Sequence, residues 1–210
     1  MRNHLEIVLP MLLAVAICAI LLGRYITGPV TNSQGAPAKV SETAIRPARG
    51  QMVRIPPKTH LYPMPTTIVG ALVKGKPNFL AIAYVGACCY EPPMVAIGIN
   101  KGHYTTAGIL ENKTFTVNIP SRDMLEATDY VGMVSGKEAD KSGLFELFYG
   151  DLKTAPMIRG ASLAMECKVL QVVDLEGSHY TIIAQVMNTF VDENVLSRGV
   201  PRSEGRRVGK

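Results

Sequence analysis

The stretch from Asn78 to Thr106 constrains the fold of this chain more than any other. Its first part carries no charged residue as far as Tyr90, and a Glu-Pro-Pro sequence at 91–93 separates it from a second apolar run at 94–99. Short apolar runs on either side of a proline turn predict two β-strands. On composition alone, the segment 82–89 is expected to be an ordinary core strand.

The first of these strands also allows a second interpretation, because it is rich in small residues. Small side chains let a flat ligand lie against the main chain, where backbone N–H and C=O groups can bind its edge. The small residues are Ala81, Ala83, Gly86 and Ala87. The strand is therefore either a core strand or an apolar platform for a planar ring.

Polar side chains follow the second strand, immediately before a helix predicted over 105–112. A cation and hydrogen-bond donors at a helix N-terminus suit a phosphate group, although a solvated turn is the ordinary alternative. The cluster consists of Asn100, Lys101, His103, Tyr104, Thr105 and Thr106, with Lys101 as the phosphate's counter-charge. A platform followed by such a cluster fits a flavin mononucleotide site better than a catalytic triad or a metal cage.

Many strands, few short helices and hairpin spacing predict an antiparallel β-barrel for the rest of the body. Apolar residues alternate with Glu166 and Lys168 along 163–169, so these two charged residues are expected on the opposite face. The capping pair Asp123 and Glu126 is expected to start a helix that ends at Met133. The further strands are expected at 66–73, 114–119 and 180–191, with turns at 74–77 and 176–179 and loops at 136–143 and 150–160.

The basic charge of the chain belongs to its ends, since residues 52–196 carry 12 basic and 14 acidic side chains. This distribution argues against a nucleic-acid surface. The four cysteines, Cys18, Cys88, Cys89 and Cys167, have no spacing typical of zinc or of a disulfide framework and are expected to be reduced. No nucleophile elbow, Walker loop or dinucleotide fingerprint is present.

Four segments are expected along the chain: 1–26, 27–57, 58–196 and 197–210. The apolar run at 7–22 predicts an uncleaved short anchor, with a signal peptide as the alternative. A flexible linker follows it, and a basic disordered tail ends the chain. We expect a cytoplasmic location, with a membrane tether through 7–22 as the alternative. A third interpretation is that the first 51 residues are a translational extension that the functional protein lacks.

From 58 to 196 the sequence resembles the flavoredoxin and flavin reductase-like family, through short motifs in a fixed order. The motifs are Lys58-Thr59, Leu61-Tyr62-Pro63, 75–78 (GKPN), 86–89 (GACC), Pro92-Pro93, Tyr104-Thr105, 115–121 (FTVNIPS), 129–132 (DYVG), Ser135-Gly136, Lys141 and Glu166-Cys167. The resemblance implies a mainly β, FMN-binding split β-barrel of Greek-key type. It also implies a homodimer with FMN at the interface and NADH or NADPH as reductant.

By this resemblance, main-chain atoms of Ala83, Tyr84, Val85 and Gly86 would face the isoalloxazine ring, with Cys88 and Cys89 at its edge. A flexible lip over the site would contain Asp129, Ser135, Gly136 and Lys141. Compared with the family's usual pattern, we expect the C-terminal segment that reaches back towards the flavin to be missing here, and the substrate side to be less complete than the flavin site. The expected function is an NAD(P)H-dependent flavin oxidoreductase that reduces a flavin, iron or protein acceptor. The alternatives are an FMN electron carrier and a cofactor-free, membrane-tethered barrel.

Overall fold

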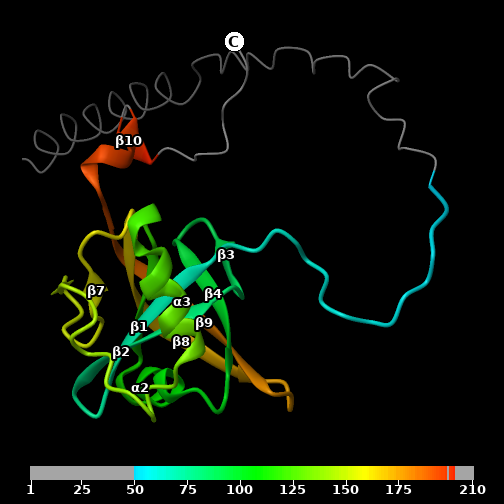
Figure 1. Ribbon diagram of the computed structural model, residues 1–210, viewed down its shortest axis with the longest axis horizontal. Helices are drawn as coiled ribbons and strands as arrows, with labels where there is room; N and C mark the ends of the chain where they lie inside the picture. Colours follow the sequence, from blue (N-terminus) through cyan, green and yellow to red (C-terminus); the bar gives the residue numbers. More distant parts are fainter. Residues whose placement is uncertain (1–49, 198, 202–210) are drawn as a thin grey trace, which may run out of the picture. The chain divides into compact units, whose positions relative to one another are not determined.

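The computed structural model describes residues 50–197 and 199–201 (Figure 1). The chain divides into two compact units, Met1–Pro57 and Lys58–Lys210, and every strand and helix described below lies in the second. The predicted anchor at 7–22 and most of the predicted linker and tail lie outside the described residues. Within the described part, no helix combines the length and the apolar character that a membrane span requires.

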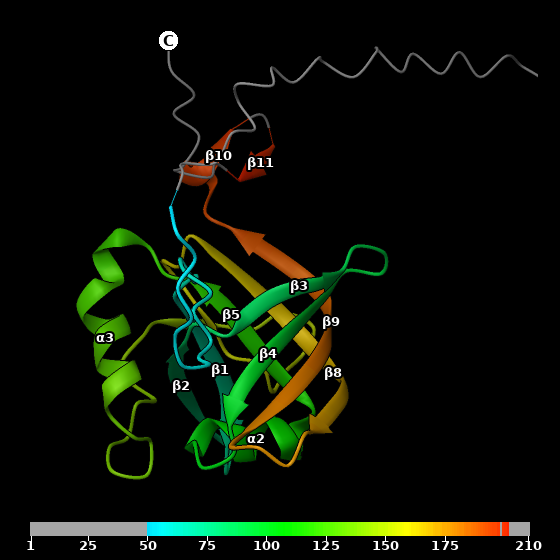
Figure 2. The ribbon, with the colours of Figure 1, turned by 90° about the vertical axis from the view of Figure 1, so that its right-hand side faces the viewer.

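One antiparallel sheet of seven strands, in the order β2-β1-β5-β8-β9-β4-β3, forms the body of this unit. Figure 2 shows that the sheet curls around its own interior. The strands are β1 (Thr67–Val73), β2 (Lys76–Ile82), β3 (Val85–Cys89), β4 (Met94–Asn100), β5 (Thr114–Ile119), β8 (Leu163–Asp174) and β9 (His179–Val191). Two small sheets pair β6 (Leu147–Phe148) with β7 (Met157–Ile158) and β10 (Leu196–Ser197) with β11 (Val200–Pro201). The predicted mainly β, antiparallel fold is confirmed.

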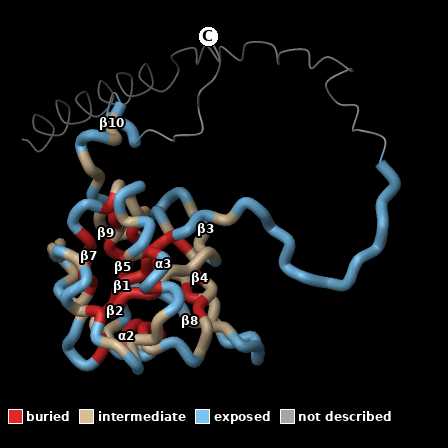
Figure 3. The backbone as a smooth tube through the Cα atoms, in the orientation of Figure 1, coloured by how far each residue is buried: buried red, intermediate tan, exposed pale blue. Residues whose placement is uncertain are grey.

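The curled sheet encloses a single apolar core, whose buried backbone is red in Figure 3. Leu80 from β2 and Ile97 from β4, which lie near opposite edges of the sheet, pack in the same cluster. Because strand side chains alternate between faces, Val69 points into this core, whereas Ile68 joins a second cluster with Val131. That second cluster lies where α3 packs against β2.

Four helical segments complete the unit: α2 (Tyr104–Asn112), η2 (Arg122–Met124), α3 (Leu125–Met133) and η3 (Glu193–Val195). Helix α2 packs closely on β1, since a Cβ atom on Gly108 would lie 2.1 Å from the carbonyl oxygen of Leu72. The Asn112 amide donates to the same carbonyl at 3.0 Å. These contacts fix the second half of α2 on β1, whereas its N-terminus at Tyr104 follows the end of β4 at Asn100.

The prediction of one uninterrupted strand before the turn at 91–93 is wrong, and the segment 82–89 is not the core strand that composition alone indicated. Strand β2 ends at Ile82 and pairs with β1, whereas β3 starts at Val85 and pairs with β4, so Ala83 and Tyr84 cross between the two edges of the sheet. Because β3 is an edge strand, its middle residues 86–88 are exposed rather than buried. The uncharged sequence hid this break, since both strands and the crossing are apolar.

Two smaller predictions also fail. Neither η2 nor α3 has a side-chain cap, so the expected capping pair of Asp123 and Glu126 does not form. Strand β8 extends beyond 169 to Asp174. Glu166 does lie on the face opposite the core but is fully buried there, because the backbone N–H groups of Asp151 and Leu152 donate to its carboxylate at 3.1 and 3.0 Å.

Candidate functional site

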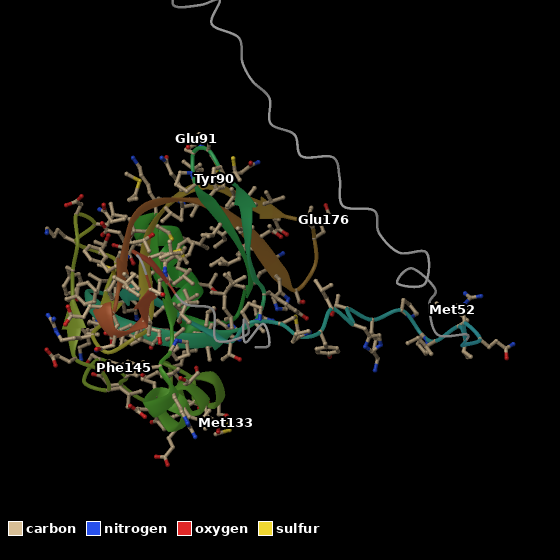
Figure 4. The ribbon with its side chains drawn as sticks, turned by 90° about the horizontal axis from the view of Figure 1, so that it is seen from above. Met52, Tyr90, Glu91, Met133, Phe145 and Glu176 are labelled. Carbon is tan, nitrogen blue, oxygen red and sulfur yellow. The ribbon has the colours of Figure 1, made fainter. Side chains whose placement is uncertain are left out.

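The free edge of β3 is the first part of the candidate site. Its residues Gly86, Ala87 and Cys88 are exposed, and no atom lies within 4 Å of a Cβ placed on Gly86. A bulge between Ala87 and Cys89 takes Cys88 out of the ladder with β4. In Figure 4 the turn after β3, marked by Tyr90, projects from the barrel. The edge therefore offers open backbone beside small side chains, as the platform hypothesis requires.

Tyr84 connects this edge to the start of β9. Its ring lies edge-on to the ring of His179, with 5.9 Å between centroids, and its hydroxyl lies 3.3 Å from the Thr59 hydroxyl. The absence of a side chain at Gly98 makes room for Tyr84, because a Cβ there would be 3.1 Å from the Tyr84 Cβ. His179, which the sequence indicated only as a turn residue, pairs with Asn100 at the end of β4.

A pocket of about 220 Å³ at the N-terminus of α2 is the second part of the candidate site. We call it the α2 pocket. Its wall joins β2, the residues before α2 and the segment after α3, whose last residue, Met133, is marked in Figure 4. The lining residues are Asn78, Leu80, Gly102, His103, Tyr104, Thr105, Gly132, Met133, Val134, Ser135, Gly136 and Lys141. The pocket brings together three residues of the predicted phosphate cluster (His103, Tyr104 and Thr105) with three of the predicted lip (Ser135, Gly136 and Lys141). The cluster residues Asn100, Lys101 and Thr106 and the exposed lip residue Asp129 do not line it.

The two threonines of the cluster are buried and already hydrogen-bonded within the protein. The Thr105 hydroxyl accepts from the Asn78 amide at 2.7 Å, and the Thr106 hydroxyl donates to the Asn100 carbonyl at 2.8 Å. These bonds fix the first turn of α2 rather than leaving both hydroxyls open to the pocket. The first N–H groups of a helix have no partners within the helix, and His103 at the N-cap provides no side-chain cap. The Thr106 N–H already donates to the His103 carbonyl at 3.1 Å, so the helix start offers an anion the N–H groups of Tyr104 and Thr105.

The lysines near this helix start differ in their partners. Lys101 forms an ion pair with Asp174 at 2.6 Å and lies over the Tyr180 ring, 5.1 Å from its centroid. Lys141 is 2% exposed, and its ammonium donates to the carbonyls of Phe79 and Val131 at 3.1 and 3.0 Å. Among the described residues no carboxylate forms an ion pair with Lys141. Burial lowers the pKa of Lys141, as expected for an ammonium without a counter-ion.

His103 lies in a positively charged environment at the mouth of the pocket. Its pKa is lowered first by burial and then by repulsion from His179, Lys141 and Lys137. The imidazole is therefore neutral at pH 7, and the positive charge of the pocket comes from lysine. The charges of Lys141 and Lys137, which disfavour a proton on His103, attract an anion.

The segment Ser135–Lys141, which we call the strap, forms one side of the α2 pocket and of a second pocket of about 220 Å³. Lys137 of the strap donates to the Gly102 carbonyl at 3.0 Å, and Asp140 forms an ion pair with Lys76 at 3.0 Å. A Cβ on Gly136 would lie 2.2 Å from the Asn78 amide oxygen, so the strap backbone lies directly on Asn78. The second pocket is lined by Lys76, Pro77, Asn78, Tyr104, Gly136, Lys137, Glu138, Ala139, Asp140 and Lys141.

Sequence reasoning missed Asn78, Lys137 and His179. Asn78 is the polar residue that begins the uncharged stretch, and this position was the sequence signal by which it could have been recognised as a site residue. Nothing in the sequence marks Lys137 or His179, because their approach to the start of α2 depends on pairing between distant segments. Cys89 is the last residue of β3, and its thiol donates to the Glu91 carbonyl at 3.5 Å, so its expected place at the edge of a flavin ring stays a prediction.

Comparison with known proteins gives consistent results. The family model described as flavin reductase like domain matches residues 59–202. The crystal structure of flavoredoxin from Methanosarcina acetivorans is 43% identical, with a TM-score of 0.71 over 73% of this chain and 82% of that one. The FMN-binding protein from Thermus thermophilus, solved with 1-cyclohex-2-enone, is 26% identical, with a TM-score of 0.64 over 75% and 87%.

A sequence relative, the uncharacterized protein YddH of Escherichia coli, is 30% identical over 125 residues. The match covers 58% of this chain and 66% of that protein, just under two thirds of its length.

Proposed function

This chain belongs to the flavin reductase like domain family, and on that basis we propose that it is an FMN-binding flavoprotein that acts as an NAD(P)H-dependent oxidoreductase. The observation that carries the proposal is Lys141, a buried ammonium that lines the α2 pocket without a carboxylate partner. A buried charge is costly unless an ion of opposite sign compensates it. The phosphate of FMN provides that charge, next to the free N–H groups of α2.

The rest of the FMN molecule fits the open edge of β3. The α2 pocket, at about 220 Å³, is smaller than the roughly 300–1,000 Å³ of a complete small-molecule site. It holds the phosphate and the adjoining ribityl atoms, so the isoalloxazine ring lies outside it, against Tyr84 and the exposed backbone at 85–87. A second copy of the chain covers the ring in this proposal, since one copy leaves that edge open.

When bound, FMN supplies the hydride and electron chemistry that no side chain of the protein can supply. The chain contributes binding and orientation. Backbone N–H groups of β3 donate to the polar edge of the ring, and Lys141 holds the phosphate end. Tyr84 and His179 form an aromatic wall against which a nicotinamide ring is held at reacting distance.

A second candidate function is a non-enzymatic FMN electron carrier. The observation in its favour is the 43% identity to a protein named flavoredoxin. This candidate needs the same FMN site but no place for a nicotinamide. The final acceptor of the oxidoreductase is a free flavin, iron or another protein, whereas the carrier exchanges electrons with partner proteins.

The visible spectrum of the purified full-length chain tests both candidates. A flavin spectrum that NADPH or NADH bleaches under anaerobic conditions supports the oxidoreductase. A flavin spectrum that only dithionite bleaches supports the carrier. A colourless protein that takes up no added FMN contradicts both and returns attention to a barrel that binds no cofactor.

A further inference from the structure

The cations around the start of α2 differ in how free they are to meet a ligand. Lys101 is already paired with Asp174, and the buried Lys141 is held by two carbonyls. Lys137 is the exposed one, and among the described residues no carboxylate forms an ion pair with it. Lys137 lines the second pocket, next to the α2 pocket. Its ammonium is therefore an exposed positive charge near the helix start that can meet an anion from the solvent side, in addition to the buried charge of Lys141.

The position of Lys137 is set by the helix start itself. Its ammonium lies 3.0 Å from the carbonyl oxygen of Gly102, the residue that immediately precedes the N-cap His103. Its charge also contributes, after burial, His179 and Lys141, to lowering the pKa of His103. A lysine ammonium is a mobile point charge with three donors, so rotation of its side chain can exchange a carbonyl for a phosphate oxygen.

We infer that Lys137 selects phosphorylated flavin over unphosphorylated flavin by closing onto the outer oxygens of the phosphate. This inference rests on the proposed function. Lys141 binds the phosphate from inside the protein, the N–H groups of α2 bind it from the helix, and Lys137 covers the side that faces solvent. The specificity is therefore for a phosphate monoester, and the ring makes no contribution to it.

The contacts of the strap leave the Lys137 side chain room to move. The C-terminal end of the strap is anchored by the buried Lys141 ammonium, and the adjacent Asp140 forms an exposed ion pair with Lys76. Lys137 lies in the exposed middle of the strap, where its ammonium donates to the Gly102 carbonyl at 3.0 Å. Movement of this one side chain therefore admits a phosphate and then closes onto it, without opening of the strap backbone.

Binding of FMN and of riboflavin to the flavin-free full-length chain tests the inference, because the two ligands differ only in the phosphate. Lys137→Met should raise the Kd for FMN about tenfold, as expected for loss of one charge-assisted contact, and leave the Kd for riboflavin within about twofold. Lys137→Arg, which keeps the charge, should recover most of the affinity for FMN. Added salt should narrow the wild-type difference between the two ligands.

Lys168→Met is the matched control, since Lys168 is exposed on β8 and its loss changes the net charge equally. This variant should bind both ligands like wild type. Equal weakening of FMN and riboflavin by Lys137→Met would show that Lys137 only supports the strap and would overturn the inference. Unchanged FMN affinity would overturn it as well. If the wild-type chain binds riboflavin and FMN equally, the inference fails while the flavin function stands; if it binds neither, the proposed function fails too.

Discussion

The ammonium of Lys101 lies 2.6 Å from a carboxylate oxygen of Asp174 and joins the end of β4 to the end of β8. The Lys101 backbone N–H donates to the Ser178 carbonyl at 3.0 Å, which strengthens the same connection. These two contacts hold the β8–β9 turn, and with it His179, beside the start of α2. The cation that the sequence placed in the phosphate cluster thus fixes the geometry of the site, and the uncompensated charge belongs to Lys141.

This division of roles predicts different effects of removing the two lysines. Lys101→Met should change the affinity for FMN by less than about threefold, because the charge that it removes is already neutralised and partly exposed. Lys141→Met should weaken FMN at least tenfold, about 1.4 kcal/mol, since it removes the buried charge that faces the phosphate. Fluorescence titration of both variants measures the effect. The reverse order of effects would restore Lys101 as the phosphate's counter-charge.

The pH dependence of stability provides a test of Lys141 without any ligand. Burial lowers its pKa in the folded chain, whereas the unfolded chain keeps a lysine pKa of about 10.4. Between these two values the unfolded chain binds more protons, so the free energy of unfolding contributed by Lys141 rises with pH. Urea unfolding should therefore show wild type gaining stability relative to Lys141→Met across that window. A constant difference between the two proteins at every pH would contradict the prediction.

His103 should titrate below the ordinary histidine pKa of about 6.5, because burial, His179, Lys141 and Lys137 all lower it. NMR titration of the imidazole in the flavin-free protein measures this directly. Lys137→Met should raise the His103 pKa part of the way back, since it removes one of the repelling charges. Because the unfolded chain takes up this proton at higher pH, His103 should reduce stability as the pH falls below about 6.5. An ordinary His103 pKa in wild type would contradict the described environment.

The cysteines should differ sharply in reactivity. Burial, and then the adjacent Glu166 carboxylate, raises the pKa of the Cys167 thiol to about 12, so almost none of it is thiolate at pH 8. Cys88 is exposed on β3. Iodoacetamide should label Cys88 in the native protein and Cys167 only after unfolding, as followed by peptide mass spectrometry. Bound FMN should slow the labelling of Cys88 if the ring lies along β3.

Sequence reasoning succeeded where one local pattern determines the outcome. The expected strand at 114–119 is β5 as observed, because its alternation and the proline at 120 leave little choice. The helix expected at 105–112 is observed as α2, which begins one residue earlier, at Tyr104. The hydrogen-bond donors before it and Gly108 within it suit a helix that packs on β1. The order of elements and the mainly β class follow from such local signals.

The failures come from pairing between distant segments. Nothing local shows that the run from Phe79 to Cys89 divides at Ala83 and Tyr84, since each half is apolar and only its partner strand differs. The burial of Glu166 likewise depends on a loop that covers the outer face of β8. The sequence pattern of a strand predicts which side chains share a face, but not which loop or helix covers that face.

Gly108 and Gly86 have different roles, because the first is required by the packing of the fold and the second by the proposed flavin site. A Cβ on Gly108 would lie 2.1 Å from the Leu72 carbonyl oxygen, which is rigid backbone, whereas a Cβ on Gly86 would meet no atom within 4 Å. Gly108→Ala should therefore destabilise the protein by about 1–3 kcal/mol through overpacking. Gly86→Leu should leave the free energy of unfolding within about 0.5 kcal/mol, as for other surface changes.

The same Gly86→Leu variant should bind FMN much more weakly, because its side chain occupies the space that the isoalloxazine ring needs beside β3. Gly86→Ala is the graded control, since one methyl group fills little of that space. Denaturant unfolding and FMN titration of the three variants give the stability and the affinity separately. If Gly86→Leu folds normally and binds FMN like wild type, the ring does not lie on β3. The platform would then have to be sought elsewhere around the α2 pocket, with Lys141 still holding the phosphate.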